Sequence, residues 1–237
     1  MWISRTICLF FVYSLMGWVY ETIFCTVKTK KWENRGFLYG PVCPIYGSGA
    51  VAITLITQLL PPLTGLPFGV EVLRIFLIAF FGSMVLEYGT SWILEKLFHA
   101  VWWDYHDMPF NLHGRISLFS SLGFGVAGPI VVFFVIPPVT AVISMLSPIM
   151  TEFLALVFTI IGTADVTLTV SALTDFERDV VQAQEAFNDR MDALVENVQT
   201  SMGAARQAAV RRVKGFRYPK LATESLTGLV EAIRNRF

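Results

Sequence analysis

The chain consists of long apolar stretches separated by short polar connections up to about residue 174, where its character changes. A helix needs about 20 mainly apolar residues to cross the hydrocarbon core of a bilayer. The pattern therefore predicts five membrane-spanning helices, over residues 5–27, 40–61, 72–94, 117–142 and 149–172. We expect an all-α, multi-pass helical bundle at residues 1–174 and a cytoplasmic tail at 175–237.

The tail has the spacing of an amphipathic helix rather than of a membrane span. Apolar residues recur three or four positions apart, at Phe187, Met191, Leu194, Val198, Met202, Ala205 and Ala209. This places them on one helix face, and the heptad-like spacing favours coiled-coil packing on a partner helix or a second copy of the chain. The basic residues Arg206, Arg211, Arg212, Lys214, Arg217 and Lys220 are also typical of a helix lying on anionic headgroups. Both interpretations stay open.

Composition and charge support the membrane assignment and orient the chain. Of 237 residues, 54% are hydrophobic and 15% are charged, whereas roughly a quarter are charged in soluble domains. Lys and Arg accumulate in cytoplasmic loops; here they occur in the connections at 28–35 and 95–116 and are absent from those at 62–71 and 143–148. We expect the N-terminus outside and the C-terminus in the cytoplasm.

Two parts of the bundle resemble each other. The segment beginning MGWVYETIF is similar to the one beginning SMVLEYGTSWILEKLF: Glu21 matches Glu87, Trp32 matches the Trp102 and Trp103 pair, Arg35 matches Arg115, and Gly47 and Gly49 match Gly123 and Gly125. Each unit holds two spans, so the copies would share one orientation as a parallel repeat of a helical hairpin. A match this short can also arise by chance, and the two explanations stay open.

Three carboxylates and two guanidinium groups share one depth. Glu21, Glu87 and Asp165 each lie six or seven residues from the inner end of their span, which is about 9–11 Å along a helix. Arg35 and Arg115 enter from the same side. Charged side chains in spans are costly and should face the bundle interior. They predict either a polar cavity open to the cytoplasm that binds a small charged solute or a lipid headgroup, or two structural ion pairs, Glu21–Arg35 and Glu87–Arg115.

The connection from Trp102 to Ile116 concentrates polar side chains: Asp104, Tyr105, His106, Asn111 and His113. Because His exchanges protons near neutral pH, the loop could serve acid–base catalysis or hold a divalent metal. Its spacing matches no zinc signature, and we expect no metal and no cofactor. The alternative is an interfacial loop in which Trp102, Trp103 and Tyr105 form an aromatic belt.

Glycines and prolines interrupt the start of the second span. The stretch GFLYGPVCPIYGSGA, residues 36–50, predicts a broken or re-entrant segment that lines protein or a cavity, or else close helix packing through small residues. The GFGVAG stretch at 123–128 lies inside an apolar span and predicts helix packing rather than nucleotide binding. No GxxxxGK[ST] motif occurs, so the chain has no P-loop of its own.

These stretches, together with LEYGTSWILEKLF and WWDYHDMPFNLHGRISLFSSLGFG, carry a family resemblance. Over residues 6–140 the chain resembles bacterial membrane proteins called ABC-transporter type IV, or CmpB-like. The matching positions are Glu21, Gly40, Pro41, Pro44, Tyr46, Gly47, Glu87, Trp103, Asp104, Tyr105, Asn111, Gly114 and Arg115. The family often has Phe-Ser-x-x-Trp-Gly after the Arg, whereas this chain reads FSSLGFG and lacks the Trp. The resemblance implies a bacterial cytoplasmic membrane location and a separate ATPase subunit, for which the tail helix is the candidate coupling surface.

Three functional hypotheses follow. The first is permease-like handling of a small charged solute through a cytoplasm-facing cavity built on Glu21, Arg35, Glu87, Arg115 and Asp165. The second is a membrane-embedded enzyme acting on a lipid headgroup, and the third is a scaffold or sensor that signals through its tail helix. Whether the protein is an enzyme stays open, and nothing indicates a nucleic-acid partner.

Overall fold

The computed structural model describes residues 1–30, 32, 35–63, 65–185 and 215–216. The described part is almost entirely helical. Its elements are α1 (Trp2–Thr29), α2 (Pro44–Leu59), α3 (Phe68–Phe98), β1 (Ala100–Val101), β2 (Asn111–Leu112), β3 (Ile116–Ser117), α4 (Leu118–Ile130), the π-helical turn η1 (Val131–Val135), α5 (Ile136–Met145), α6 (Pro148–Glu185) and β4 (Gly215–Phe216).

Four helical segments within the described residues are long and apolar enough to cross a membrane: Trp2–Thr29, Phe68–Phe98, Leu118–Met145 and Pro148–Asp175. The third of these joins α4, η1 and α5 into one continuous helix. The stretch predicted as a span at 40–61 forms α2, an apolar helix of only 16 residues. The all-α membrane fold with about five apolar helices is thus confirmed, and one of the five is short.

Proline and glycine explain why α2 is short. The backbone from Gly36 to Pro41 forms consecutive bends, and the helix begins only at Pro44, a position where the missing N–H of proline leaves no helical bond unmade. The helix ends before Pro61 and Pro62, because a residue preceding proline disfavours helical backbone. The predicted break in this segment therefore occurs before α2.

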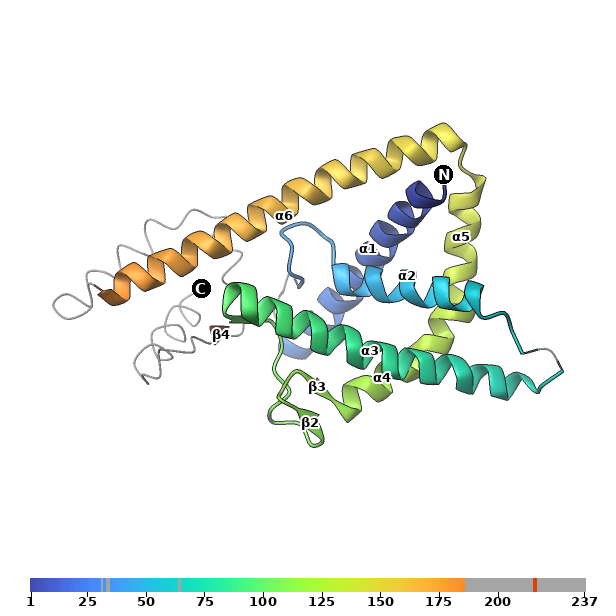
Figure 1. The fold of residues 1–237 in the computed structure, drawn as a ribbon, viewed down its shortest axis with the longest axis horizontal. Coiled ribbons are helices and arrows are strands. Elements are labelled where there is room, and N and C mark those ends of the chain that lie inside the picture. The colour runs from blue at the N-terminus through green and yellow to red at the C-terminus, as the bar shows by residue number, and fades with distance from the viewer. Residues whose placement is uncertain (31, 33–34, 64, 186–214, 217–237) are drawn as a thin grey trace.

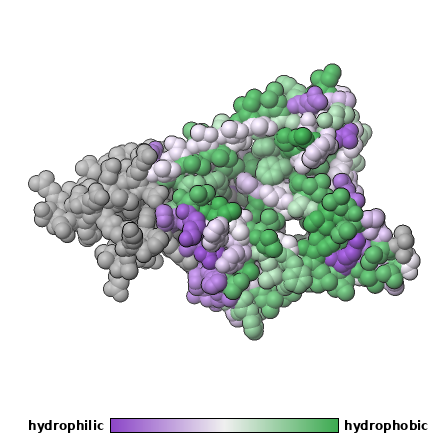
Figure 2. Space-filling model, viewed as in Figure 1, coloured by the Kyte–Doolittle hydropathy of each residue, from purple (hydrophilic) through white to green (hydrophobic). Residues whose placement is uncertain are grey.

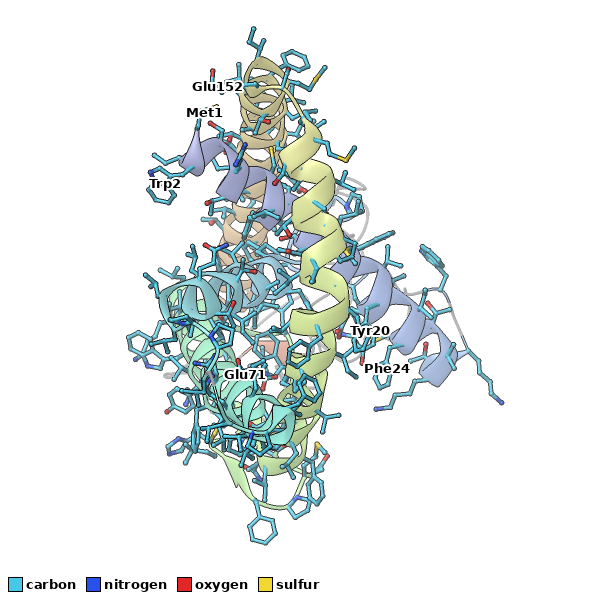
Figure 3. The ribbon with its side chains drawn as sticks, turned by 90° about the vertical axis from the view of Figure 1, so that its right-hand side faces the viewer. Met1, Trp2, Tyr20, Phe24, Glu71 and Glu152 are labelled. Carbon is cyan, nitrogen blue, oxygen red and sulfur yellow. The ribbon has the colours of Figure 1, made fainter. Side chains whose placement is uncertain are left out.

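The connections alternate between two ends of the molecule (Figure 1). The N-terminus, the α2–α3 connection and the α5–α6 turn lie at one end, whereas the end of α3 and the β2–β3 hairpin lie toward the other. Met1, Glu71 and Glu152, near the starts of α1, α3 and α6, mark the first end (Figure 3). We call the opposite end the loop end. This alternation is what a multi-pass helical bundle requires.

The helices pack mainly as two hairpins, α1 on α2 and α3 on α4, and α6 packs along α1. Hydrophobic residues cover most of the described surface in Figure 2. Val85 on α3, for example, is 73% exposed, and Ile23 and Phe134 are also exposed. Exposed apolar side chains on so many helix faces have no counterpart in soluble monomers, and they fit a surface in contact with lipid.

Two small buried clusters hold α6 in place. Near the loop end, Ala172 and Leu173 pack with Phe98, the last residue of α3, and with Ala100 and Trp102, which follow it. At the other end, Ala155 of α6 packs with Cys8 of α1 and Ile143 of α5. The long helix α6 is thus fixed against other helices near both ends.

Helix α6 continues past residue 174, where the sequence predicts a change of domain, and runs to Glu185. The predicted amphipathic face from Phe187 to Ala209 lies outside the described residues. From the later part of the tail, β4 pairs with β1 in antiparallel register, with Ala100 opposite Phe216 and Val101 opposite Gly215. The tail therefore returns to the end of α3, an arrangement that the sequence did not predict.

Candidate functional site

Glu87 is the most deeply buried acid among the described residues, with 5% of its surface exposed. It lies on α3 and accepts two hydrogen bonds from groups outside that helix. The hydroxyl of Tyr105, in the connection after β1, donates to Oε1 over 3.1 Å. The hydroxyl of Ser120 in α4 lies 3.3 Å from Oε2. The carboxyl group thus links three segments of the α3–α4 hairpin.

The position of Ser120 follows from the start of α4. Ser117 is the N-cap of this helix: its side chain accepts from the Ser120 N–H over 3.1 Å, and its own N–H donates to Ser120 Oγ over 3.3 Å. This reciprocal capping arrangement fixes the first turn of a helix. The hydroxyl proton of Ser120 is then shared between the Ser117 carbonyl, 2.9 Å away, and Glu87.

Glu21 has an equivalent place in the first hairpin. The hydroxyl of Tyr46 in α2 donates to its carboxylate, and the Cys25 thiol lies 3.9 Å from Oε1. Gly17 lets the tyrosine approach, because a Cβ at that position would overlap the Tyr46 side chain. The Tyr46 ring also lies 6.2 Å from the ring of Phe124 in α4, centroid to centroid. Tyr46 therefore bridges the two hairpins.

The two acids belong to one electrostatic environment. The charge of Glu21 acts on Glu87, and the charges of both acids act on Tyr105. Burial raises the pKa of Tyr105, and the neighbouring Glu87 carboxylate raises this pKa further. Tyr105 therefore stays a neutral hydroxyl donor at physiological pH. We call Glu21, Tyr46, Glu87, Tyr105 and Ser120 the acid–hydroxyl cluster.

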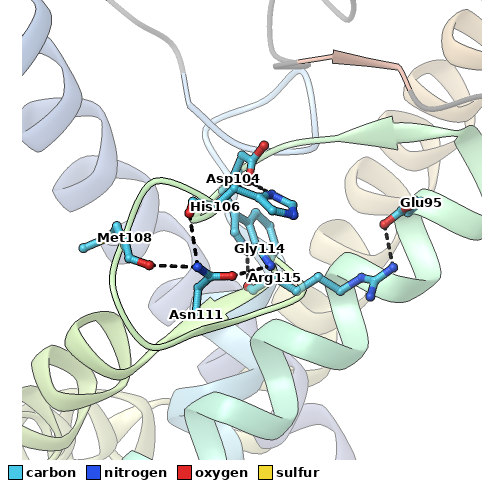
Figure 4. Close-up of polar contacts among 8 residues, drawn as sticks. Glu95, Asp104, His106, Met108, Asn111, Gly114 and Arg115 are labelled. Carbon is cyan, nitrogen blue, oxygen red and sulfur yellow. Dashed lines mark hydrogen bonds and ion pairs between the residues drawn. The ribbon is translucent and has the colours of Figure 1, made fainter.

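The ion pairs predicted for the two arginines are not the ones found. Arg115 pairs with Glu95, with 2.8 Å between Nη2 and Oε2 (Figure 4). Its guanidinium lies 5.3 Å from the Tyr88 ring centroid. The prediction of a Glu87–Arg115 pair was therefore wrong, because Glu95, two helical turns further along α3, lies nearer the loop. Glu21 takes the Tyr46 hydroxyl as a partner, and among the described residues no ion pair joins Glu21 to Arg35.

Asp165 binds backbone rather than joining the other acids in hydrogen bonding. Its Oδ1 accepts from the N–H of Tyr39 and its Oδ2 from the N–H of Gly40, both over 2.8 Å. A Cβ at residue 40 would lie 2.6 Å from Oδ2, so only glycine fits there without a shift. Irregular backbone at membrane depth must have its polar groups satisfied by protein. Asp165 meets this requirement for the segment before α2.

The polar residues of the loop mostly build the loop itself (Figure 4). The side-chain amide of Asn111 donates to the carbonyls of His106 and Met108, and its oxygen accepts from the Gly114 N–H. Asp104 accepts from the backbone N–H of His106 and contacts its ring. Gly114 has φ +66°, and a Cβ there would overlap the ring of His106. The loop residues that the sequence offered as possible catalytic or metal-binding groups are thus used to hold the loop in a compact hairpin.

The remaining loop residues also contact neighbouring protein groups, although the His113 side chain is exposed. His113 Nδ1 lies 3.2 Å from the Tyr88 hydroxyl, and the indole N–H of Trp103 donates to the Arg115 carbonyl over 2.9 Å. Trp102 is only 8% exposed. Trp102 therefore packs inside the loop end, whereas Trp103 and Tyr105 are partly exposed, and an aromatic belt that includes these two residues stays a prediction. In the described part of the chain, no three His, Cys, Asp or Glu side chains are grouped closely enough to hold a metal ion.

Three residues of this region were not among the predicted site residues: Tyr46, Ser120 and Glu95. Tyr46 belongs to the Gly-Pro-rich stretch that carries the family resemblance, and Ser117 and Ser120 have the spacing of a capping box. These signals place Tyr46 and Ser120 near the starts of helices. Their contacts with acids on other helices depend on how the hairpins pack.

Comparison with known proteins identifies one family. The model of the family described as Putative ABC-transporter type IV matches residues 8–170, which is more than half of the chain and includes the whole acid–hydroxyl cluster. No curated protein and no solved structure matches. The match and the long apolar helices together indicate a membrane protein related to transport.

Proposed function

Since the chain belongs to the ABC-transporter type IV family, we propose that it is the membrane part of a transport system and handles a small charged solute at the acid–hydroxyl cluster. The observation that carries this proposal is the position of Glu21 and Glu87. The two carboxyl groups lie on α1 and α3, in two hairpins that contact each other through Tyr46, and both helices are apolar. Ionisable groups in spans are costly and mark binding or transport sites by default.

The partners of these acids favour a positively charged solute. Among the described residues, Glu21 and Glu87 contact hydroxyl and thiol groups, whereas Arg115 is paired with Glu95 and Arg74 with Glu71. Hydroxyl groups can turn from donating to a carboxylate to accepting from an ammonium ion or coordinating a metal cation. A cation entering the cluster would therefore find two acids and three hydroxyl groups.

Energy for transport would come from another chain, because this sequence has no P-loop. We propose a separate ATPase subunit, as the family description suggests, docking on the cytoplasmic side. With the N-terminus outside, as the distribution of Lys and Arg predicts, the loop end would face the cytoplasm, and the proposed solute would reach the cluster from that side. The bonds within the 104–115 loop do not favour the alternative of a lipid-headgroup enzyme.

The experiment compares conservative variants for cation binding. Glu21→Gln and Glu87→Gln keep an acceptor for Tyr46, Tyr105 and Ser120 but remove the charge. Thermal unfolding in detergent would be measured with sodium, potassium, ammonium and a series of small primary amines. A cation at about 100 times its Kd should stabilise the wild type by about 2.7 kcal/mol, and both variants should lose this gain.

Glu95→Gln is the matched control, because it removes a carboxylate from α3 that pairs with Arg115. It should lower the basal stability yet keep the cation-dependent gain. If none of the cations stabilises the wild type, or if Glu87→Gln responds as the wild type does, the cluster is structural and the proposal fails. Native mass spectrometry of gently purified protein would independently identify a bound cation or an ATPase subunit.

A further inference from the structure

The loop that leads into β2, together with the last residue of this strand, exposes three large apolar side chains: Met108, Phe110 and Leu112. Phe110 is 78% exposed and Leu112 is 50% exposed, although the rest of the loop is closed by its own hydrogen bonds. We call these three residues the apolar tip. Neighbouring polar residues, such as Asp107, are also exposed, so the exposed apolar surface covers only part of the loop.

Phe110 occupies a backbone conformation that does not suit it. Its φ is +55°, in the left-handed region where bulky residues are uncommon and glycine or asparagine is favoured. Residues kept in such conformations tend to have a role beyond the local turn. The turn itself would form more readily with glycine, so the phenyl side chain needs another explanation.

The apolar tip continues the lipid-facing surface of α4. The Phe110 carbonyl accepts from the N–H of Leu118 over 3.2 Å, which places the tip beside the first turn of α4. In that turn and the next, Leu118, Phe119 and Leu122 are exposed, and α4 begins a segment long and apolar enough to span a membrane. Figure 1 shows the hairpin alongside the start of α4, at the edge of the bundle.

We propose that the apolar tip inserts into the bilayer at the loop end and contacts the acyl and glycerol region of phospholipids. Of the tryptophan rings expected to form this contact, that of Trp102 packs inside the protein, and the apolar tip supplies exposed apolar surface at this end. The exposed area of Phe110 is then buried in lipid, which offsets the unfavourable φ. This inference does not depend on the identity of the solute.

Insertion also positions the acid–hydroxyl cluster. Tyr105, which donates to Glu87, begins the same loop, and its N–H donates to the Gly114 carbonyl over 2.8 Å. Insertion of the apolar tip into lipid would therefore fix the position of the loop and, with it, the position of the Tyr105 hydroxyl beside Glu87.

Site-directed spin labelling tests the insertion. Phe110→Cys would carry a nitroxide in full-length protein reconstituted into vesicles of phosphatidylethanolamine and phosphatidylglycerol. Collision with oxygen, which concentrates in lipid, would be compared with collision with a water-soluble nickel chelate. Val126→Cys, at an exposed position in α4, is the lipid control, and Asp107→Cys is the loop control in water. Wild-type protein, whose three cysteines are buried, measures background labelling.

The label at Phe110 should favour oxygen over nickel, as at Val126, while the label at Asp107 favours nickel. Leu112→Cys provides a second reporter on the tip in case the change at Phe110 alters the turn. If the labels at both tip positions favour nickel as strongly as that at Asp107, the tip lies in water and the proposal is overturned. The apolar tip would then be a candidate surface for a protein partner.

Discussion

The α1–α2 and α3–α4 hairpins both place an acid against a hydroxyl group from their second half, Glu21 against Tyr46 and Glu87 against Ser120. Their connections are supported in opposite ways. The segment before α2 has irregular backbone and depends on Asp165 of α6. The loop before α4 closes on itself through Asn111 and Gly114. The same pairing of an acid with a hydroxyl group can therefore be supported by a residue of a distant helix or by hydrogen bonds within the connecting loop.

This difference has consequences for how the hairpins respond to change. The first hairpin should lose its connection when α6 is altered, and the second should lose it only when its own loop is altered. Whether the similarity between residues 16–50 and 83–128 reflects duplication or chance stays open.

The largest effect is expected from Asp165→Ala, which tests the dependence of the first hairpin on α6. The change leaves the N–H groups of Tyr39 and Gly40 without their acceptor. At about 1–3 kcal/mol for each stranded donor, the free energy of unfolding should fall by about 2–6 kcal/mol, measured by denaturation in mixed micelles. Glu152→Ala, at an exposed position of the same helix, should change it by less than about 0.5 kcal/mol. Equal stability of the two variants would contradict the role of Asp165.

Gly114→Ala tests the self-supporting loop of the second hairpin. The methyl group would overlap the His106 ring, and overpacking of this kind typically costs about 1–3 kcal/mol. The left-handed backbone conformation adds about 1–2 kcal/mol for a residue other than glycine. A loss of about 2–5 kcal/mol in unfolding free energy is therefore expected. Gly123→Ala is the matched control in α4, because a Cβ there meets nothing within 4 Å. A stable Gly114→Ala variant would show that the loop adapts and is less rigid than its bonds indicate.

The smallest effect is expected from removing one tyrosine hydroxyl at each acid, which compares Glu21 with Glu87 directly. Hydrogen bonds to charged groups contribute about 1.5–3 kcal/mol, and Tyr46→Phe should lose an amount in this range, because only the distant Cys25 thiol remains for Glu21. Tyr105→Phe should lose less, since Ser120 remains for Glu87. Unfolding measured at neutral pH for both variants decides the order. The reverse order would mean that Ser120 bonds mainly to the Ser117 carbonyl.

Much of the fold could be predicted from local pattern. Apolar length predicts the spans, and the glycines and prolines of residues 36–50 predict the interruption before α2. The depth of Glu21 and Glu87 in their helices was also readable, because rise per residue is constant. These features depend on neighbouring residues along the chain.

The partners of the charged groups were not readable in the same way. Arg115 could meet either Glu87 or Glu95 on α3, and the choice depends on how the loop folds back. Asp165 could have joined the other acids, but the bends after Gly36 bring backbone N–H groups to it first. Prediction by matching charges fails here because hydroxyl groups and backbone can satisfy an acid as well as an arginine can.

The sequence by itself determined that this is a mainly helical membrane protein and predicted acids at a common depth, since apolar length and helical rise are local properties. Only the tertiary structure decided that Tyr46 joins the two hairpins, that Asp165 holds the segment before α2, and that Phe110 rather than Trp102 is exposed at the loop end. Each of these contacts joins residues far apart in the chain, and their geometry depends on how whole helices pack.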